Sequence, residues 1–317
     1  MKVSKLIYSI LLLCSLMLLV LKFQKKKNEK LNIGIVQIVE HESLDKARNG
    51  FIDEMKNLGY KDADFDIQIA GGDISNLSSI SSKFVNDKKD LILAISTPAA
   101  QAVANATKDI PILSTAVTDF ESAGLVDSLN VPGRNVSGTS DLVPVEKQIN
   151  LLKTLIPNCK KIGILYSSNE SNSKIQADMA KKEAQKLDME SKDYTVSNSN
   201  EIQQVVEQMS VDAIFVPTDN LIVSSMPAVS KIANDRKIPI ICSESGSVKN
   251  GALASNSMDY YELGKITAKQ ADKIIKKENQ PQNMPISFLD STKLIINKET
   301  SKKLGISIPE NLKGELI

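Results

Sequence analysis

The chain has few of the side chains on which metal sites, disulfide frameworks and proton-transfer catalysis usually depend. Its 317 residues include one histidine, three cysteines and no tryptophan. Cys14, Cys159 and Cys242 form no CxxC or Cys/His grouping, which argues against a zinc site or a disulfide framework. We therefore expect no metal and no cofactor. We also expect Cys159 and Cys242, each beside an apolar strand, to be buried thiols.

An excess of one charge and the motifs of several enzyme classes are missing as well. Lysine plus arginine number 39 and aspartate plus glutamate 38, so no excess of positive charge favours nucleic acid as a partner. No P-loop, HExxH or G-x-S-x-G motif occurs, and Gln37–Glu40 stands where a dinucleotide-binding G-x-G-x-x-G would follow the first strand. Because no nucleophile–base pair is apparent either, we expect a protein that is not an enzyme.

Residues 1–30 have the layout of a secretory signal or a membrane anchor. Lys2 and Lys5 precede the apolar run Leu6–Leu21, and a lysine-rich neck follows it. As a helix this run would span about 24 Å, which is short of a hydrocarbon core of about 30 Å. We favour an uncleaved anchor on the outer face of the cell membrane. Cleavage, or lipidation at Cys14, remains an alternative, and the lysines behind the run conflict with the positive-inside rule.

From Leu31 onward, apolar strand-like runs alternate with helical patterns, which is typical of an α/β fold with parallel strands. The alternation of strand and helix patterns begins again after Pro144, which predicts two βα arrays and a cleft between them. Strands are predicted at Asn32–Val39, Phe65–Ala70, Leu91–Ile95, Pro111–Leu113, Asn135–Thr139, Lys161–Tyr166, Glu190–Tyr194, Asp212–Val216, Ile238–Ile241 and Gly251–Ser255. Helices are predicted at Leu44–Leu58, Leu77–Asn86, Val145–Leu155, Ser173–Leu187, Glu201–Met209 and Tyr260–Lys276. The tail is predicted to add a returning strand and a cap, over Ile286–Leu289, Leu294–Ile296 and Thr300–Leu304.

Small hydroxylated residues stand at the ends of two adjacent predicted strands. Ser96-Thr97-Pro98 follows Leu91–Ile95, and Ser114-Thr115-Ala116 follows Pro111–Leu113. In an open parallel sheet, ligands bind in the crevice beyond the carboxyl ends of the strands. Hydroxyl groups there suit hydrogen bonds to a small polar ligand rather than proton transfer, so the pattern predicts a binding site.

Five segments carry a resemblance to a known family. They are GIVQIVEH at Gly34–His41, KFVNDKKDLILAISTPAAQAVANATKDIPILSTAVTD at Lys83–Asp119, PGRNVSGTSD at Pro132–Asp141, VDAIFVPTDN at Val211–Asn220 and MDYYELGK at Met258–Lys265. With them the chain resembles the substrate-binding proteins of ABC transporters, in particular the subfamily linked to uptake of aromatic amino acids, over about Leu31 to Pro309. A standard lipobox is missing, which leaves the mode of anchoring open.

The resemblance implies a type I periplasmic-binding fold, in which a three-segment hinge near Asp141, Asp259 and Pro285 joins two Rossmann-like lobes. Lobe 1 would comprise 31–141 plus 259–284, and lobe 2 would comprise 142–258 plus 285–317. The implied function is that of an extracytoplasmic component of an ABC importer. It would capture an amino-acid-like ligand, such as tryptophan or phenylalanine, by hinge closure and deliver it to permease and ATPase subunits. We expect a monomer. A ligand-sensing ectodomain without transport is the alternative.

Polar residues at the strand ends of both arrays are the candidate ligand contacts. The carboxylate of an amino acid needs hydroxyls and backbone N–H groups at helix N-termini, which points to Ser96, Thr97, Thr115 and Ala116. Its ammonium needs carboxylates in a water-poor cleft, which points to Asp219 first, and to Glu244 and Asp141.

The remaining candidates have less defined roles, and they are His41, Ser168, Asn172, Asn220 and Asp259. Helix capping is the alternative for each serine, threonine, aspartate and asparagine. A structural hydrogen bond is the alternative for His41. For Tyr166 and Tyr260 we favour packing in the core or hinge over stacking on an aromatic ligand.

Overall fold

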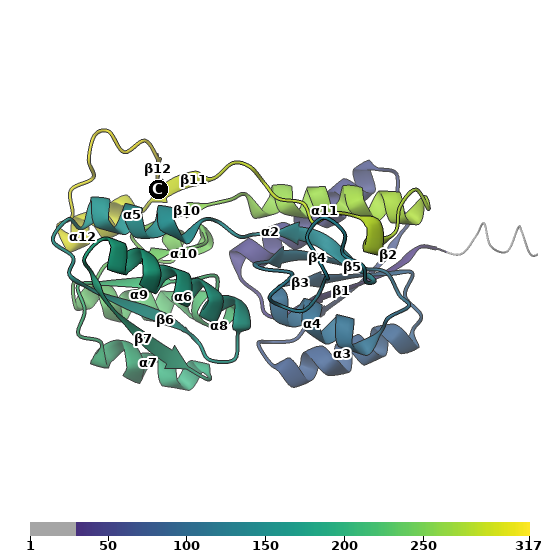
Figure 1. Ribbon diagram of the computed structural model, residues 1–317, viewed down its shortest axis with the longest axis horizontal. Coiled ribbons are helices and arrows are strands. Elements are labelled where there is room, and N and C mark those ends of the chain that lie inside the picture. The colour runs from purple at the N-terminus through teal and green to yellow at the C-terminus, as the bar shows by residue number, and fades with distance from the viewer. Residues whose placement is uncertain (1–29) are drawn as a thin grey trace, which may run out of the picture.

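Two mainly parallel sheets, one in each of two lobes, organise the chain (Figure 1). The structure is a computed structural model, and it describes residues 30–317. The predicted membrane anchor therefore lies outside the described residues, except for Lys30. Within the described part, no helix combines the length and the apolar character needed to cross a membrane.

The sheet of lobe 1 has the strand order β2-β1-β3-β4-β5, and every neighbouring pair is parallel. The central strands read LILAI and ILSTAV with every residue buried, because helices cover both faces of such a sheet. Figure 1 shows α2 and α11 above this sheet and α3 and α4 below it. The strands are β1 (Asn32–Gln37), β2 (Asp64–Ile69), β3 (Leu91–Ile95), β4 (Ile112–Val117) and β5 (Val136–Ser140). The helices are α2 (Glu42–Asn57), α3 (Ile74–Asn86), α4 (Thr97–Ala106) and α11 (Tyr260–Ile275).

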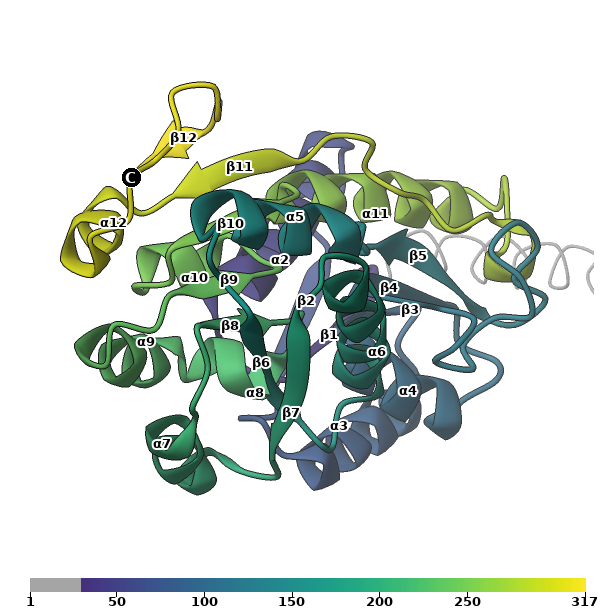
Figure 2. The same cartoon turned by 60° about the vertical axis from the view of Figure 1, so that its left-hand side comes forward.

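The sheet of lobe 2 has the order β12-β11-β10-β9-β8-β6-β7, and only the β10–β11 pair is antiparallel. The C-terminus lies beside β11 and β12 in both views (Figures 1 and 2). The strands are β6 (Lys161–Ser167), β7 (Glu190–Val196), β8 (Ala213–Val216), β9 (Ile240–Cys242), β10 (Ala254–Ser257), β11 (Lys293–Ile296) and β12 (Glu315–Leu316). The helices are α5 (Val145–Leu155), α6 (Ser171–Lys186), α7 (Ser199–Gln208), α8 (Asn220–Ser224), α9 (Met226–Asp235), α10 (Gly246–Lys249) and α12 (Lys298–Leu304). A short 3-10 helix, η1 (Pro281–Asn283), instead contacts β5 of lobe 1.

The predicted α/β fold with two parallel-sheet lobes is confirmed. β3 and α5 have the predicted bounds, and Cys159 and Cys242 are buried free thiols, as expected. The predicted strand at Ile286–Leu289 is wrong, since only Ser287 pairs there, in a single bridge to Thr139 of β5. Pro285 has no N–H to donate, which prevents the ladder from extending on the N-terminal side of Ser287.

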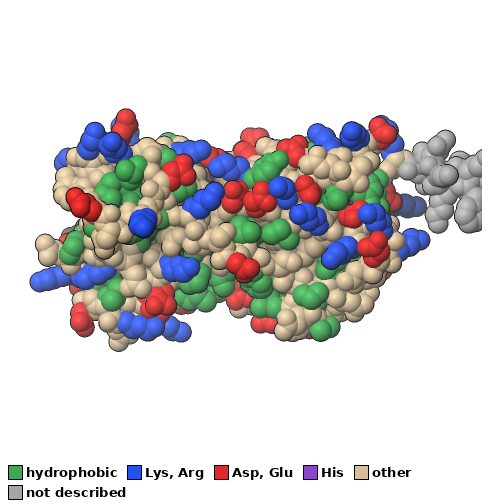
Figure 3. Space-filling view, turned by 90° about the horizontal axis from the view of Figure 1, so that it is seen from above, with side chains coloured by type: hydrophobic (Ala, Val, Ile, Leu, Met, Phe, Trp, Pro, Cys, Tyr) green, Lys and Arg blue, Asp and Glu red, His purple; other side chains and the backbone are tan. Residues whose placement is uncertain are grey.

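The chain passes between the sheets at three places. It leaves the lobe 1 sheet after β5, returns from β10 to pack α11 against α2, and goes back to lobe 2 before β11. Figure 3 shows the face of the molecule seen from above, where basic and acidic side chains are intermixed and no histidine is visible. This face therefore has no patch of one sign that would attract nucleic acid or a charged surface.

Glycines allow α2 and α11 to approach each other closely. A Cβ atom on Gly264 would lie 2.0 Å from the Ala47 oxygen, and one on Gly50 would lie 2.1 Å from the Tyr261 oxygen. A side chain at either position would force the two helices apart, so glycine is required by packing rather than by backbone angles.

Gly264→Ala is expected to lower the free energy of unfolding by about 1–3 kcal/mol, because overpacking displaces α11 from α2. The free energy of unfolding can be measured in urea for this variant and for a control, Lys273→Ala. The control changes an exposed position of the same helix. The control should stay within about 0.5 kcal/mol of the wild type. Equal stability of the two variants would show that the helices are not in close contact.

Candidate ligand-binding site

The carboxyl ends of strands from both sheets meet at a small cavity between the lobes, here called the inner cavity. Its volume is about 20 Å³, which is room for about one water molecule. Lobe 1 and the crossing segments contribute His41, Leu44, Ala116, Thr118, Asp141 and Tyr260. Lobe 2 contributes Asn172, Thr218, Asp219, Asn220, Val223 and Glu244. The lining contains three carboxylates and no lysine or arginine, so it suits a cationic group.

A larger hollow of about 590 Å³, here called the mouth hollow, lies next to the inner cavity and shares Asn220 with it. Its volume falls within the range of small-molecule sites. The apolar part of its wall comes from both lobes and consists of Ile38, Val39, Ile74, Pro98 and Leu221. The two spaces together offer a polar end and a partly apolar end.

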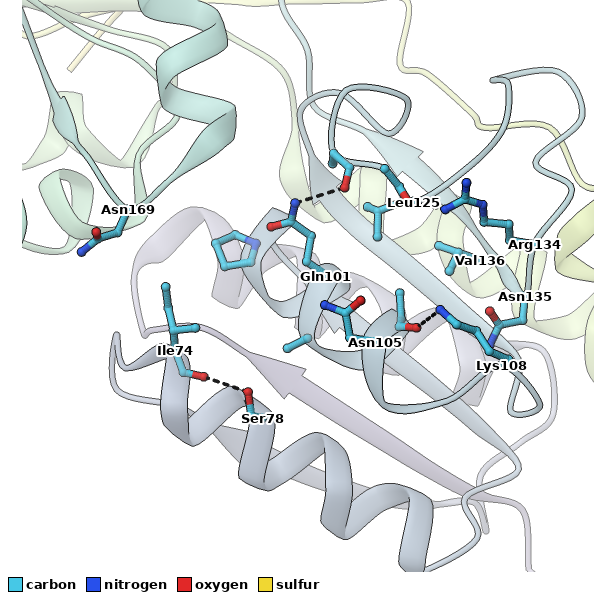
Figure 4. A pocket seen from close by; sticks show the side chains of 15 residues that line it. Ile74, Ser78, Gln101, Asn105, Lys108, Leu125, Arg134, Asn135, Val136 and Asn169 are labelled. Atoms are coloured by element: carbon cyan, nitrogen blue, oxygen red, sulfur yellow. Dashed lines mark hydrogen bonds between the residues drawn. The ribbon is translucent and has the colours of Figure 1, made fainter.

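A groove of about 430 Å³ runs along α3 and α4 of lobe 1 (Figure 4) and shares Ile74, Pro98 and Asn169 with the mouth hollow. Gln101 and Asn105 of α4 border it, together with Lys108 and Arg134, and of its lining residues only Asn169 belongs to lobe 2. The groove has no carboxylate in its lining, so it does not suit a cationic ligand as the inner cavity does.

Asp141 is the acidic residue of the inner cavity that stands beside the crossing segments. It is buried, and its two oxygens accept hydrogen bonds from the hydroxyls of Thr118, at 3.1 Å, and Tyr260, at 2.9 Å. Burial raises the pKa of Asp141 to about 6, although these two hydrogen bonds act in the opposite direction. Its charge is therefore incompletely compensated, and a ligand cation would supply the missing partner.

Both oxygens of Asp219 are engaged by backbone N–H groups. One accepts from Ser167 at 2.6 Å and the other from Ile222 at 2.8 Å, where Asp219 caps α8. Burial raises the pKa of this carboxyl, and the N–H donors oppose the shift. The contacts show a capping role, which was the alternative interpretation for this residue.

Glu244 joins the lobes. Its carboxylate accepts from the backbone N–H groups of Gly246, at 2.8 Å, and Ser247, at 2.6 Å, and from the hydroxyl of Ser43 in lobe 1. It is buried. This residue therefore both holds the start of α10 and contacts the opposite lobe at the edge of the inner cavity.

Two buried polar atoms in the lining of the inner cavity have no hydrogen-bond partner. They are Nδ1 of His41, from lobe 1, and Oδ1 of Asn172, from lobe 2. Burial lowers the pKa of His41, so its imidazole is neutral at pH 7. Unpaired buried polar atoms are costly, and a ligand group that pairs with them would recover that cost.

Two residues at the strand ends of lobe 1 have a backbone that side chains other than glycine rarely adopt. Ser96, after β3, has a φ of 97°, and Ala116, near the end of β4, has a φ of 56°. Such conformations cluster at binding sites, where the surrounding structure imposes them. Their place at the crevice agrees with a ligand site there.

The structure brings seven of the twelve predicted contacts to the inner cavity: His41, Ala116, Asp141, Asn172, Asp219, Asn220 and Glu244. The other five do not line it. Ser96 caps α4, Thr97 approaches the Thr118 N–H, Thr115 accepts from the Thr139 hydroxyl, Ser168 is exposed, and Asp259 caps α11. Ligand contact by these residues stays a prediction.

Five residues of this lining are not among the predicted contacts. One of them, Tyr260, was assigned to packing in the core or hinge, and it lines the cavity while it donates to Asp141. Thr118 and Thr218 follow β4 and β8, so the strand-end signal that selected their neighbours could have found them. Leu44 and Val223 carry no polar signal. Within residues 30–317, no group of three or more His, Cys, Asp or Glu side chains is placed to hold a metal ion.

The comparisons with known proteins agree with this geometry. Residues 32–315 match the family described as ABC transporter substrate binding protein. A tyrosine-binding protein of Clostridioides difficile is 51% identical over 290 residues, which cover 90% of this chain and 83% of that protein.

Two solved structures extend the comparison. The ABC domain of Streptococcus pneumoniae in complex with L-Trp has a TM-score of 0.88 and 40% identity, and the match covers 91% of this chain and all of that one, 100%. A ligand-free, open structure of a substrate-binding protein with adhesive properties from Clostridium difficile has a TM-score of 0.69 and 47% identity, over 90% of this chain and 98% of that one. The chain therefore belongs to the family of ABC transporter substrate binding proteins.

Proposed function

We propose that this protein is the extracytoplasmic substrate-binding component of an ABC importer, and that it captures an aromatic amino acid, L-tyrosine or L-tryptophan, without changing it chemically. The observation that carries the proposal is the inner cavity, where buried carboxylates and unpaired acceptor atoms from two lobes converge with no lysine or arginine. The names of the tyrosine-binding relative and of the L-Trp complex support the aromatic ligand class.

In the proposed pose, the ammonium occupies the inner cavity and the aromatic ring occupies the mouth hollow. Asp141 supplies the charge for the ammonium, and the neutral acceptor atoms complete its hydrogen bonds. The ring packs on Val39, Pro98 and Leu221. The carboxylate faces the start of α4, where the helix dipole favours an anion.

Contacts across the cleft support a closed arrangement of the lobes. The hydroxyls of Thr118 and Thr218 are 3.0 Å apart, and Lys249 of lobe 2 forms an ion pair with Glu42 of lobe 1 at 2.6 Å. The chain is more identical to the open Clostridium structure than to the L-Trp complex, yet it superimposes better on the complex. Hinge closure around the ligand, with lobes of 31–141 plus 259–284 and of 142–258 plus 285–317, accounts for that difference.

The proposed partners follow from the family. A permease and an ATPase would receive the ligand from a monomeric receptor, which residues 1–30 would hold at the outer face of the cell membrane. Loss of the protein should then lower uptake of labelled tyrosine or tryptophan by cells. Unchanged uptake together with tight binding would favour the sensing role.

Titration calorimetry of the purified protein against the twenty amino acids tests the ligand class. We expect L-tyrosine and L-tryptophan to bind most tightly, and small hydrophilic amino acids to give no heat, because they cannot fill the apolar part of the mouth hollow. A folded protein that binds none of the twenty would contradict the proposed function.

Affinity for L-tyrosine should fall at low pH. The ammonium binds the ionised form of Asp141, and burial raises the pKa of this carboxyl to about 6 in the free protein. The ligand must therefore displace a proton below that pH, and affinity should drop about tenfold between pH 7.5 and pH 5. Asp141→Asn should remove most of this dependence. An affinity that is constant over this range would exclude Asp141 as the partner of the ammonium.

A further inference from the structure

Glu170 lines the mouth hollow and not the inner cavity, yet it contacts two residues that line the inner cavity, Asn172 and Asn220. It is buried at the N-terminus of α6. One carboxylate oxygen accepts from the backbone N–H of Asn220 at 3.2 Å, from the Asn220 side-chain Nδ2, and from Nδ2 of Asn172 at 3.4 Å. The other accepts from the Leu221 N–H at 3.1 Å. All four contacts to this carboxyl group are N–H donors. Burial and the neighbouring Asp219 raise the pKa of Glu170 to about 8, and the N–H donors act in the opposite direction, in favour of the ionised form.

These contacts fix which way two side-chain amides face. An asparagine amide has one oxygen and one NH₂ group, so holding the NH₂ group on Glu170 turns the oxygen to the opposite side. Asn172 Nδ2 also donates to the Thr218 oxygen at 2.7 Å, which reinforces its orientation. Its Oδ1 is buried without a hydrogen-bond partner, and the residue lines the inner cavity.

The orientation of Asn220 also bears on the tautomer of His41, because both side chains line the inner cavity. Burial lowers the pKa of the imidazole, which keeps the ring neutral. Nδ1 has no partner, so Nε2 is the nitrogen left to pair with the Asn220 side chain. Because Glu170 holds the Asn220 NH₂ group, the Asn220 oxygen is free to accept, and pairing with it places the proton on Nε2. Nδ1 of the neutral ring is then a lone-pair acceptor.

We propose that Glu170 is a positioning residue which turns the amide oxygens of Asn172 and Asn220, rather than their NH₂ groups, toward the ligand, so that the site selects a ligand with an ammonium and rejects the same molecule without it. This rests on the proposed function. An ammonium has three N–H donors and pairs with Asn172 Oδ1, His41 Nδ1 and a carboxylate. A ligand without the ammonium leaves these acceptors buried and unpaired, which costs affinity.

The binding test compares L-tyrosine with 3-(4-hydroxyphenyl)propanoate, which lacks only the ammonium. The wild-type protein should bind the deaminated compound at least about 100-fold more weakly. Glu170→Gln keeps the shape but introduces an NH₂ group that competes for the amide oxygens, so the ratio should shrink by about tenfold. Glu121→Gln is the matched control, because Glu121 likewise accepts a backbone N–H, that of Leu129 at 3.0 Å, but on an exposed loop. Its ratio should equal that of the wild type.

The tautomer can be read directly, since His41 is the single histidine of the chain. Nitrogen-15 NMR of the histidine-labelled protein at pH 7.5 should show a neutral ring protonated at Nε2, with an unprotonated Nδ1 whose signal moves when L-tyrosine binds. Glu170→Gln should give a mixture of tautomers. A ring protonated at Nδ1 in the wild type would overturn the proposal, and this result needs no variant to fold.

The outcomes separate the two proposals. If the wild-type protein binds neither L-tyrosine nor L-tryptophan, the proposed function fails, and the NMR measurement still decides the positioning role. If L-tyrosine and its deaminated analogue bind equally well, the positioning proposal fails while amino-acid binding stands. An unchanged ratio in a folded Glu170→Gln protein would also overturn it.

Discussion

Asp141→Asn is expected to weaken the binding of L-tyrosine by about 10- to 100-fold at pH 7.5, because a charged hydrogen bond contributes about 1.5–3 kcal/mol. The asparagine keeps the size of the side chain and can still accept from Tyr260 or Thr118. The change therefore removes the charge that faces the ligand and leaves the packing near the crossing segments intact. Titration calorimetry at fixed pH measures the effect.

The same substitution should raise stability in the absence of ligand. Burial raises the pKa of Asp141 to about 6, above its usual range, so the folded protein holds this proton more tightly than the unfolded chain. The resulting stability is present below about pH 4 and is lost as the pH rises through about 6. At pH 8 the uncharged variant should be more stable by about 1–3 kcal/mol. Lower stability together with unchanged affinity would show that Asp141 is a structural residue and no ligand contact.

Asp219→Ala is expected to lower the free energy of unfolding by about 2–4 kcal/mol. The two backbone N–H groups of Ser167 and Ile222 lose their acceptor in a buried place, and each unsatisfied group costs about 1–3 kcal/mol. Urea unfolding followed by circular dichroism measures the loss. Any loss of ligand affinity would follow from displacement of α8, which carries Asn220.

The matched control is Asp73→Ala, which removes the N-terminal cap of α3. Asp73 accepts from the Ser75 N–H at 2.7 Å but is exposed, so water replaces the lost acceptor. Its cost should be about 1 kcal/mol or less. If Asp219→Ala costs no more than the control and abolishes binding, Asp219 is the ammonium partner that the sequence suggested first.

Much of the fold could be predicted because burial leaves a mark in the sequence. β3 reads as an unbroken apolar run and is buried over its whole length, and α5 ends where Pro157 disfavours helix in the residue before it. The same strands led to the crevice, since the carboxyl ends of parallel strands share one edge of a sheet. The hydrophobic pattern of the sequence therefore identified the edge of the sheet at which the candidate site lies.

What the sequence could not supply was the pairing of distant residues. Asp141 and Tyr260 hydrogen-bond to each other across 119 positions, and Glu170 reaches Asn220 across 50. Nothing in local periodicity links such positions. The crossings between the lobes were likewise inferred from the family resemblance. The order of predicted strands and helices alone does not say which lobe α11 joins.

Capping and ligand binding also use the same residue types at the same places. Ser96, Asp219 and Asp259 all stand where a helix starts. The side-chain oxygen of each accepts a hydrogen bond from a backbone N–H group of that helix. Asp141 is different because its partners are side-chain hydroxyls, which the sequence does not reveal. Only coordinates distinguish an acceptor that is already satisfied from one that still lacks a partner.

A structure of the protein grown with L-tyrosine tests the central claim most directly. We predict an unaltered amino acid between the lobes, with its ammonium within hydrogen-bonding distance of Asp141 and of Asn172 Oδ1, and with its ring against Pro98 and Leu221. Tyrosine seated against Asn105, Lys108 and Arg134 in the groove along α3 and α4, or contacting one lobe only, would contradict the account.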